Sequence, residues 1–223
     1  MKIIKNGIKY FLLKFFGKYI NVSFSRSGDD IQLMKLINNN SSGVYVDIGS
    51  WHPVKASNTY FFYLRNWRGI CIDPNPTLAL SYKKLRPKDT FINAGIGNSD
   101  KQLDYFMFEE SSMNTFSQNF INDNNLQSKI VKKIQVPIFS LKEVLDKNLK
   151  KGERLDFFDV DVEGFDLEVL KTNDWDLYRP KVIVVESDGS IKNDVISEIN
   201  SGLSRVVPEF LDGDRDKFGQ SND

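Results

Sequence analysis

Two short apolar segments that each end in a carboxylate constrain the fold of this chain more than any other feature. They are residues 44–49, Val-Tyr-Val-Asp-Ile-Gly, and residues 69–74, Gly-Ile-Cys-Ile-Asp-Pro. A strand in a parallel sheet is buried on both faces and is therefore apolar along its length, and its carboxyl end opens into the crevice where such sheets bind ligands. The two segments therefore predict neighbouring parallel strands with a ligand site at their ends.

The residues at these two ends distinguish between nucleotide cofactors. Gly49 allows the backbone to approach a ligand closely, and Asp73 stands where a ribose diol requires an acceptor. A dinucleotide needs further glycines beside its pyrophosphate, but residues 50–53 are Ser-Trp-His-Pro. NAD is therefore disfavoured. S-adenosylmethionine has a ribose and no phosphate, so one such glycine and one such acid suffice for it.

The order of elements along the chain predicts a doubly wound, mostly parallel α/β sheet. Apolar segments alternate with helical patterns from residue 44 onward, and Ser140 and Glu143 have the spacing of a capping box. Strands are predicted at 44–48, 69–73, 90–94, 155–160 and 181–186, and helices at 57–67, 77–85, 140–149, 165–171 and 191–203.

Length and composition indicate one domain with additions. The chain has 223 residues, of which 40% are apolar, and this is enough for one substantial core. We expect an N-terminal amphipathic helix and linker at 1–40, the domain at 41–204 and a polar tail at 205–223. Within the domain, 103–135 is predicted to be an insertion or lid, although 103–108 alternates like a strand.

Three motifs, in this order, resemble the FkbM-type family of S-adenosylmethionine-dependent methyltransferases. They are Val-Asp-Ile-Gly at 46–49, Ile-Asp-Pro-Asn-Pro at 72–76 and Asp-Val-Asp-Val-Glu-Gly-Phe-Asp-Leu-Glu-Val-Leu at 159–170. The resemblance implies a Rossmann-like class I methyltransferase fold and transfer of a methyl group from S-adenosylmethionine to an oxygen, as on a hydroxyl of a sugar or another small molecule. The chain departs from the family pattern at 51–53, where Trp-His-Pro replaces smaller residues.

The C-terminal region departs from the pattern of class I methyltransferases as well. Their sheets normally end in a reversed strand hairpin, whereas here only 205–211 is apolar enough for a strand, and Pro208 interrupts it. The last strands are therefore expected to be short or incomplete.

The cofactor site is predicted at the strand ends. Asp73 is expected to accept hydrogen bonds from the ribose, or alternatively to cap the turn before Pro74. Gly49 and Ser50 are expected to border the methionine moiety, and Asp47 is expected to orient their loop or to reach the ammonium group. The complete predicted set is Asp47, Gly49, Ser50, Asp73, Asn93, Ala94 and Asp161.

Two further groups complete the predicted binding surface. Asn93 and Ala94 end the third strand and could border adenine, although asparagine is equally common at a plain turn. Glu186 closes the fifth strand and is the candidate for acceptor contact. The rest of the acceptor pocket is expected to come from 103–135 and the N-terminal helix.

Three residues are candidates for the chemistry. Asp161, which the resemblance places beside the cofactor, and Glu163 flank the expected position of the methyl group. Two close carboxylates can raise one pKa and leave a base. Glu163 could instead cap a helix. His52, the only histidine, could accept a proton near neutral pH or simply pack a loop. No metal is predicted, because Asp159 joins this pair on one face only if the strand has no bulge.

Charge and cysteine content limit the partners. The six basic residues that precede the first acid, Asp29, leave an acidic body, which argues against a nucleic-acid-binding face. Cys71 is the only cysteine, so a disulfide and a cysteine-based zinc site are both excluded, and a reduced, cytoplasmic location is the simplest expectation.

The N-terminal 1–22 segment has apolar residues at helical spacing with interleaved lysines. Such a helix packs on its own domain, on a second copy in a homodimer, or peripherally on an anionic membrane. Lys9 and Lys14 interrupt the segment, so no apolar stretch in it approaches the length needed to span one.

Two other functions compete with methyl transfer. A degenerate Rossmann-like domain would bind a ligand or partner without catalysis, and its cofactor site would have been lost at 51–53. A nicotinamide oxidoreductase would need the glycines that the chain lacks.

Overall fold

The computed structural model describes residues 22–37, 42–98, 102–150, 152–162 and 164–185. The predicted N-terminal helix, the predicted 191–203 helix and the tail lie outside these residues. None of the described helices is long and apolar enough to cross a membrane.

The centre of the protein is a five-stranded sheet with the order β3-β2-β1-β7-β8. Every neighbouring pair in it is parallel, which confirms the Rossmann-like α/β fold that the sequence predicts. All residues of β1, β7 and β8 are buried, as expected for strands covered on both faces. The strands are β1 (Val44–Ile48), β2 (Arg68–Ile72), β3 (Thr90–Ile92), β7 (Phe157–Val160) and β8 (Val182–Val185).

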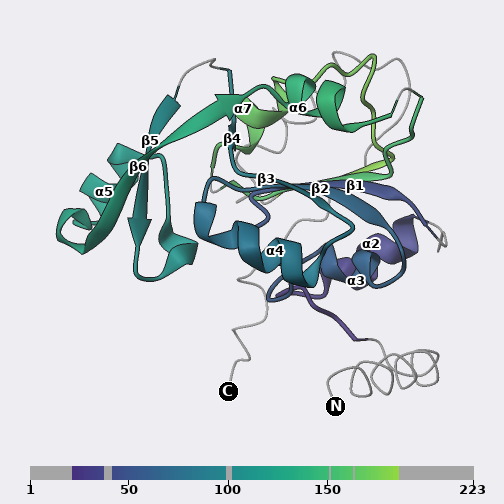
Figure 1. Cartoon of the computed structure of the whole chain (residues 1–223), viewed down its shortest axis with the longest axis horizontal. Coiled ribbons are helices and arrows are strands. Elements are labelled where there is room, and N and C mark those ends of the chain that lie inside the picture. Colours follow the sequence, from purple (N-terminus) through teal and green to yellow (C-terminus); the bar gives the residue numbers. More distant parts are fainter. Residues whose placement is uncertain (1–21, 38–41, 99–101, 151, 163, 186–223) are drawn as a thin grey trace, which may run out of the picture.

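Helices cover both faces of this sheet (Figure 1). One face packs against α2 (Asp29–Leu36), α3 (Tyr60–Tyr63) and α4 (Ala79–Leu85), and the other packs against α6 (Leu141–Asn148) and α7 (Asp166–Leu170). Side chains alternate along a strand, so successive residues of β1 enter different cores. Each large apolar side chain that is buried in these cores stabilises the folded state by about 1.5–3 kcal/mol.

The helices agree with the sequence predictions to different degrees. Ser140 and Glu143 form the predicted capping box at the start of α6. The helix predicted at 77–85 begins as the 3-10 turn η1 (Pro76–Leu78) and continues as α4. The helix predicted at 57–67 contracts to α3, because Asn66 turns into a left-handed conformation and Trp67 is fully buried.

Helix α2 was not predicted, although it belongs to the core. Leu33 and Ile37, from the segment expected to be a linker, are 0% and 2% exposed and pack with α3 and α4. Helix α2, ahead of the first strand, therefore forms part of the same folded body.

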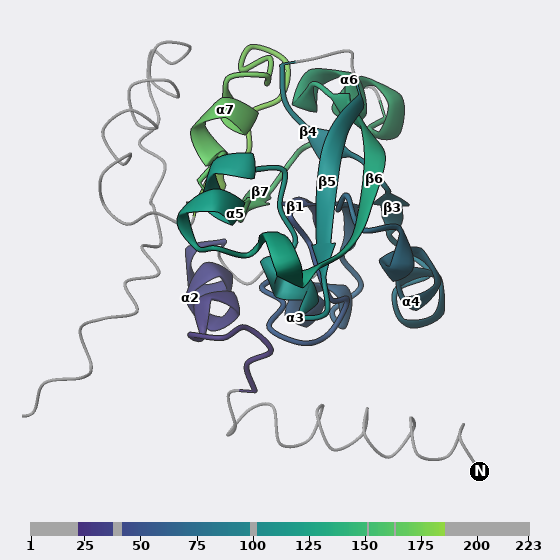
Figure 2. The ribbon, with the colours of Figure 1, turned by 90° about the vertical axis from the view of Figure 1, so that its left-hand side faces the viewer.

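A second, smaller sheet lies at one end of the layers (Figure 2). It has the order β4-β6-β5, with β4 parallel and β5 antiparallel to β6. The segment expected to be a loop or lid is thus largely structured, and it has a small core of its own around Phe106 and Ile121. The second sheet and this segment together contain β4 (Gly95–Ile96), β5 (Gln102–Phe108), η2 (Ser111–Met113), α5 (Gln118–Asp123), η3 (Gln127–Lys129) and β6 (Ile130–Phe139).

Candidate active site

A cavity of about 400 Å³ opens where the carboxyl ends of the parallel strands face the second sheet. Its volume is within the range of small-molecule and cofactor sites. One part of its lining comes from the ends of β1, β2, β7 and β8, and the other comes from β4, β5 and the 111–116 segment. The predicted ligand position at the strand ends therefore coincides with a real cavity.

Gly49 joins the ends of two strands at the floor of this cavity. Its N–H and that of Ser50 both donate to the Ile72 carbonyl, at 3.0 and 3.1 Å, and the Asp161 N–H donates to the Ile48 carbonyl at 3.0 Å. Gly49 has φ +81°, and a Cβ atom there would lie 1.9 Å from the Asp161 carbonyl oxygen. A glycine is thus required by the chain itself, a reason additional to the close ligand approach that the sequence suggested.

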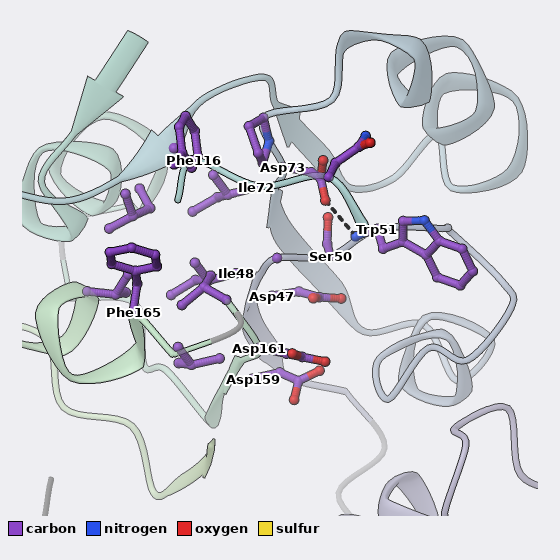
Figure 3. A pocket seen from close by; sticks show the side chains of 18 of the residues that line it. Asp47, Ile48, Ser50, Trp51, Ile72, Asp73, Phe116, Asp159, Asp161 and Phe165 are labelled. Atoms are coloured by element: carbon purple, nitrogen blue, oxygen red, sulfur yellow. Dashed lines mark hydrogen bonds between the residues drawn. The ribbon is translucent and has the colours of Figure 1, made fainter. Parts of the chain in front are cut away.

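Asp73 lies at the end of β2 and is only 6% exposed. Its two carboxylate oxygens accept the backbone N–H groups of Trp51, at 2.9 Å (Figure 3), and Asn75, at 2.8 Å. An ionised carboxylate has about four acceptor positions, so capacity remains for a ligand. Burial raises the pKa of Asp73 to about 6, because desolvation penalises its charged form.

The two residues predicted to border adenine differ in their positions. Ala94 is buried and lines the cavity. Asn93 is exposed and outside the lining, and its amide donates to the Asp73 backbone carbonyl at 2.9 Å. This geometry favours the turn-forming alternative for Asn93.

Asp47 and Asp159 lie side by side on the sheet face that carries α3. They are register partners in β1 and β7. Asp47 accepts a hydrogen bond from the Thr59 hydroxyl, and Asp159 accepts one from the Asn58 amide at 3.0 Å. Burial raises the pKa of Asp47 to about 6, and burial together with the charge of Asp47 raises the pKa of Asp159 well above its usual value. Simultaneous ionisation of both carboxyl groups is therefore unfavourable.

Asp161 extends this group of carboxylates. It follows the end of β7, is exposed and lines the cavity, and Figure 3 shows its side chain near those of Asp159 and Asp47. The rings of Phe116 and Phe165 lie in another part of the same cavity. The cavity thus has an acidic part and an apolar part.

A buried arginine supports the acidic part from beneath. The Arg86 side chain is fully buried, and it donates to Asp89 at 2.6 Å, to the Tyr45 hydroxyl at 2.7 Å and to the Thr59 hydroxyl at 3.0 Å. Its nearest approach to Asp47 is 4.0 Å. No sequence signal pointed to this network, because Arg86 follows two lysines at a helix end and resembles a surface residue.

Ser50 and Trp51 connect the loop after β1 to its surroundings. The Ser50 carbonyl accepts a hydrogen bond from the Tyr82 hydroxyl at 2.9 Å, whereas its own buried hydroxyl has no partner among the described residues. Trp51 has φ +37°, which is unusual for a bulky residue, and its indole N–H donates to the Ser111 hydroxyl at 3.0 Å. The loop after β1 and the 111–116 segment of the cavity wall are therefore joined by a hydrogen bond.

Of the remaining predicted residues, only His52 lies in the described part of the chain. His52 is not part of its lining, and its Nδ1 accepts the backbone N–H groups of Val54, at 3.1 Å, and Lys55, at 2.9 Å. Burial and Lys55 lower the pKa of His52, and the geometry favours its loop-packing role. Glu163 and Glu186 lie outside the described residues. In the part of the chain that the structure describes, no three His, Cys, Asp or Glu side chains are grouped as metal ligands.

A parallel sheet of this order, with a cavity at its strand ends and a buried acid after β2, defines a Rossmann-like α/β domain with a ligand site at the strand ends. The sequence model described as the methyltransferase FkbM domain matches residues 47–206, which is more than half of the chain. The protein therefore belongs to the FkbM methyltransferase family, as its motifs suggested. No curated protein and no solved structure matches it.

Proposed function

We propose that the cavity binds S-adenosylmethionine and that the protein transfers its methyl group to a hydroxyl oxygen of a sugar or another small molecule. The observation that carries the proposal is Asp73, a buried carboxylate that faces the cavity with acceptor capacity left for a ribose diol. The family of the chain supports a methyl donor, and the proposed oxygen preference rests on the resemblance to that family.

The residues present fit this cofactor. Asp73 would hold the ribose, and Ala94 would border the adenine. Gly49 and Ser50 would border the methionine moiety, and the buried Ser50 hydroxyl, which has no partner among the described residues, offers a hydrogen bond to it. The bound cofactor supplies an electrophilic methyl group, which the protein has to align with an acceptor oxygen.

The carboxylates of the acidic part would serve the acceptor. An acceptor hydroxyl loses its proton as its oxygen forms the new bond to carbon, and a carboxylate within hydrogen-bonding reach can take that proton. Asp161 lines the cavity beside the end of β1, where the methyl group would lie, and Asp159 is next to it. Proximity supplies most of the acceleration, and a general base adds about 10²–10⁴.

Replacement of Asp73 tests the cofactor site. We expect Asp73→Ala to weaken S-adenosylmethionine binding at least tenfold, because each lost charge-assisted hydrogen bond is worth about 1.5–3 kcal/mol. Asp73→Asn should keep part of the affinity. Isothermal calorimetry measures both, with circular dichroism to show that the variants are folded.

Asp176→Ala, at an exposed position outside the cavity, is the matched control and should bind normally. Wild-type protein should not bind NAD. Unchanged affinity in folded Asp73→Ala would refute the assignment of Asp73. Release of S-adenosylhomocysteine in the presence of hydroxylated acceptors would then test the transfer itself.

The pKa of Asp73 makes cofactor binding dependent on pH. Ribose hydroxyls bind the ionised carboxylate best, and the buried group has a pKa of about 6. The affinity for S-adenosylmethionine should therefore approach its maximum as the pH rises above 6. It should fall as the pH decreases through 6, by up to about tenfold per pH unit. Calorimetric titrations on both sides of this pH measure the effect.

Asp73→Asn separates this contribution from that of Asp47, whose pKa is also about 6. The variant should lose part of the pH dependence, since it has no carboxylate at position 73. An identical dependence in wild type and variant would show that Asp73 does not bind the ligand as an anion.

A further inference from the structure

A short segment ahead of α2 is held in place by one buried carboxylate. Asp30 is 0% exposed, and it accepts hydrogen bonds from the Ser23 hydroxyl at 2.7 Å, the Phe24 N–H at 2.7 Å and the Ser25 hydroxyl at 3.3 Å. The Ser25 hydroxyl in turn accepts the Gly28 N–H at 2.7 Å. The backbone is thus fixed on both sides of residue 26.

The same segment is attached to the rim of the cavity. The Phe24 carbonyl accepts a hydrogen bond from the Ser57 N–H at 3.0 Å. The Phe24 side chain packs edge-on against the Tyr60 ring, with 4.9 Å between the ring centroids. Ser57 and Asn58 line the cavity on the side of β1. Arg26, two residues after Phe24, lines it as well. A fixed support therefore presents Arg26 to the β1 side of the cavity.

Arg26 is the only basic side chain among the described residues that line the cavity. It is exposed, and it has no hydrogen-bond or ion-pair partner in the described part of the chain. The other charged groups of the lining are all carboxylates: Asp29, Asp47, Asp73, Asp159, Asp161 and Glu168. Arg26 forms an ion pair with none of these six acids. Its guanidinium is therefore available for an anionic group of a ligand.

We propose that Arg26 binds the carboxylate of the methionine moiety of S-adenosylmethionine. The proposal rests on the proposed function. With the ribose at Asp73, the methionine moiety would extend across Gly49 toward β1, where Asp47 would receive its ammonium group. Its carboxylate would be repelled by these acids, and the planar guanidinium of Arg26 offers it two parallel hydrogen bonds. Arg26 precedes the matched residues 47–206, so family membership does not assign it this role.

A comparison between ligands with and without the amino-acid carboxylate tests this contact. 5′-Methylthioadenosine contains the adenine, ribose and thioether but lacks the amino-acid carboxylate. We expect Arg26→Gln to weaken binding of S-adenosylmethionine and S-adenosylhomocysteine about tenfold or more, and to leave 5′-methylthioadenosine unchanged. Arg26→Lys should be intermediate, since it keeps the charge without the planar fork. Calorimetry on the full chain gives the affinities.

The sign of the change is informative. Without a carboxylate contact, removal of a cation from an acidic cavity would strengthen the binding of positively charged S-adenosylmethionine. Arg154→Gln, at an exposed position outside the cavity, is the matched control and should change neither affinity.

Three outcomes would overturn the proposal. An equal loss for both ligands, unchanged affinity for both, or tighter binding of S-adenosylmethionine would each show that Arg26 does not hold the carboxylate. In these cases wild-type protein still binds the cofactor, and the proposed function stands. If wild-type protein binds neither ligand, the proposed function itself fails, and this inference fails with it.

Discussion

Gly49→Ala is expected to destabilise the protein and to remove the cofactor site together. The new Cβ atom would lie 1.9 Å from the Asp161 carbonyl oxygen, so the ends of β1 and β7 would have to separate. A left-handed conformation costs a residue with a Cβ atom about 1–2 kcal/mol even without a collision. We expect a loss of more than about 2 kcal/mol in the free energy of unfolding and at least a tenfold loss of S-adenosylmethionine affinity, measured by denaturant unfolding and calorimetry.

Gly152→Ala is a matched control for the steric part of this effect. Gly152 has φ +79°, close to the +81° of Gly49, but a Cβ atom there would meet nothing within 4 Å. Its substitution should therefore cost only the conformational strain and leave ligand binding intact. If both variants lost the same free energy of unfolding, the collision with the Asp161 carbonyl would be contradicted.

The parts of the fold that could be predicted are those that depend on local pattern. β1 and β2 were recognised because strands covered on both faces consist almost wholly of apolar residues. The start of α6 was recognised because a capping box is formed by two residues three positions apart. Asp73 was placed beside the cavity because the end of a parallel strand faces the crevice.

The parts that could not be predicted depend on contacts distant in sequence. β6 was missed because most of its first half faces solvent, with Val131 68% exposed, and because the alternation of Ile134, Val136 and Ile138 contains Pro137, which argues against a strand. Arg26 is placed at the cavity through contacts of Phe24 with Ser57 and Tyr60, which are distant in sequence. The tie between Trp51 and Ser111 joins residues that are 60 positions apart. Neither the contacts of Phe24 nor the Trp51–Ser111 hydrogen bond produces a periodic pattern in the sequence.

The predicted chemistry shows the same division. Asp161 lines the cavity because it immediately follows a recognisable strand. His52 follows the glycine loop, and the near-neutral pKa of an ordinary histidine together with this sequence proximity suggested a role in catalysis. The orientation of its ring depends on the turn at Val54 and Lys55, whose N–H groups it accepts. Adjacency in sequence thus predicted the position of a strand end better than the direction of a loop side chain.

Arg86→Met is expected to be strongly destabilising. It would leave the buried Asp89 without its charged partner and the Tyr45 and Thr59 hydroxyls without a donor, while Asp47 would lose a nearby cation. Removal of one partner from a buried ion pair typically costs about 3–5 kcal/mol, because the other charge stays buried without compensation. Denaturant unfolding measures this loss.

Arg68→Met provides the comparison, since Arg68 pairs with Glu153 at a partly exposed position where side-chain exposures are 31% and 20%. Arg68→Met should lower the free energy of unfolding by about 1 kcal/mol or less. The double variant Arg86→Met/Asp89→Leu should recover part of the stability lost in Arg86→Met, because it removes the uncompensated charge. If Arg86→Met cost no more than Arg68→Met, the buried network would not contribute to stability.

The stability deficit of Arg86→Met should also depend on pH. Arg86 lowers the pKa of Asp47, which burial otherwise raises, so the pKa of Asp47 in the variant should rise above its value of about 6. A carboxyl group whose pKa is raised in the folded state lowers the stability of the protein as the pH rises from the unfolded-state pKa of that group through its folded-state pKa. The deficit relative to wild type should therefore be larger above pH 6 than below it. A deficit independent of pH would mean that Arg86 acts only through packing and neutral hydrogen bonds, and that the acidic part of the cavity does not depend on its charge.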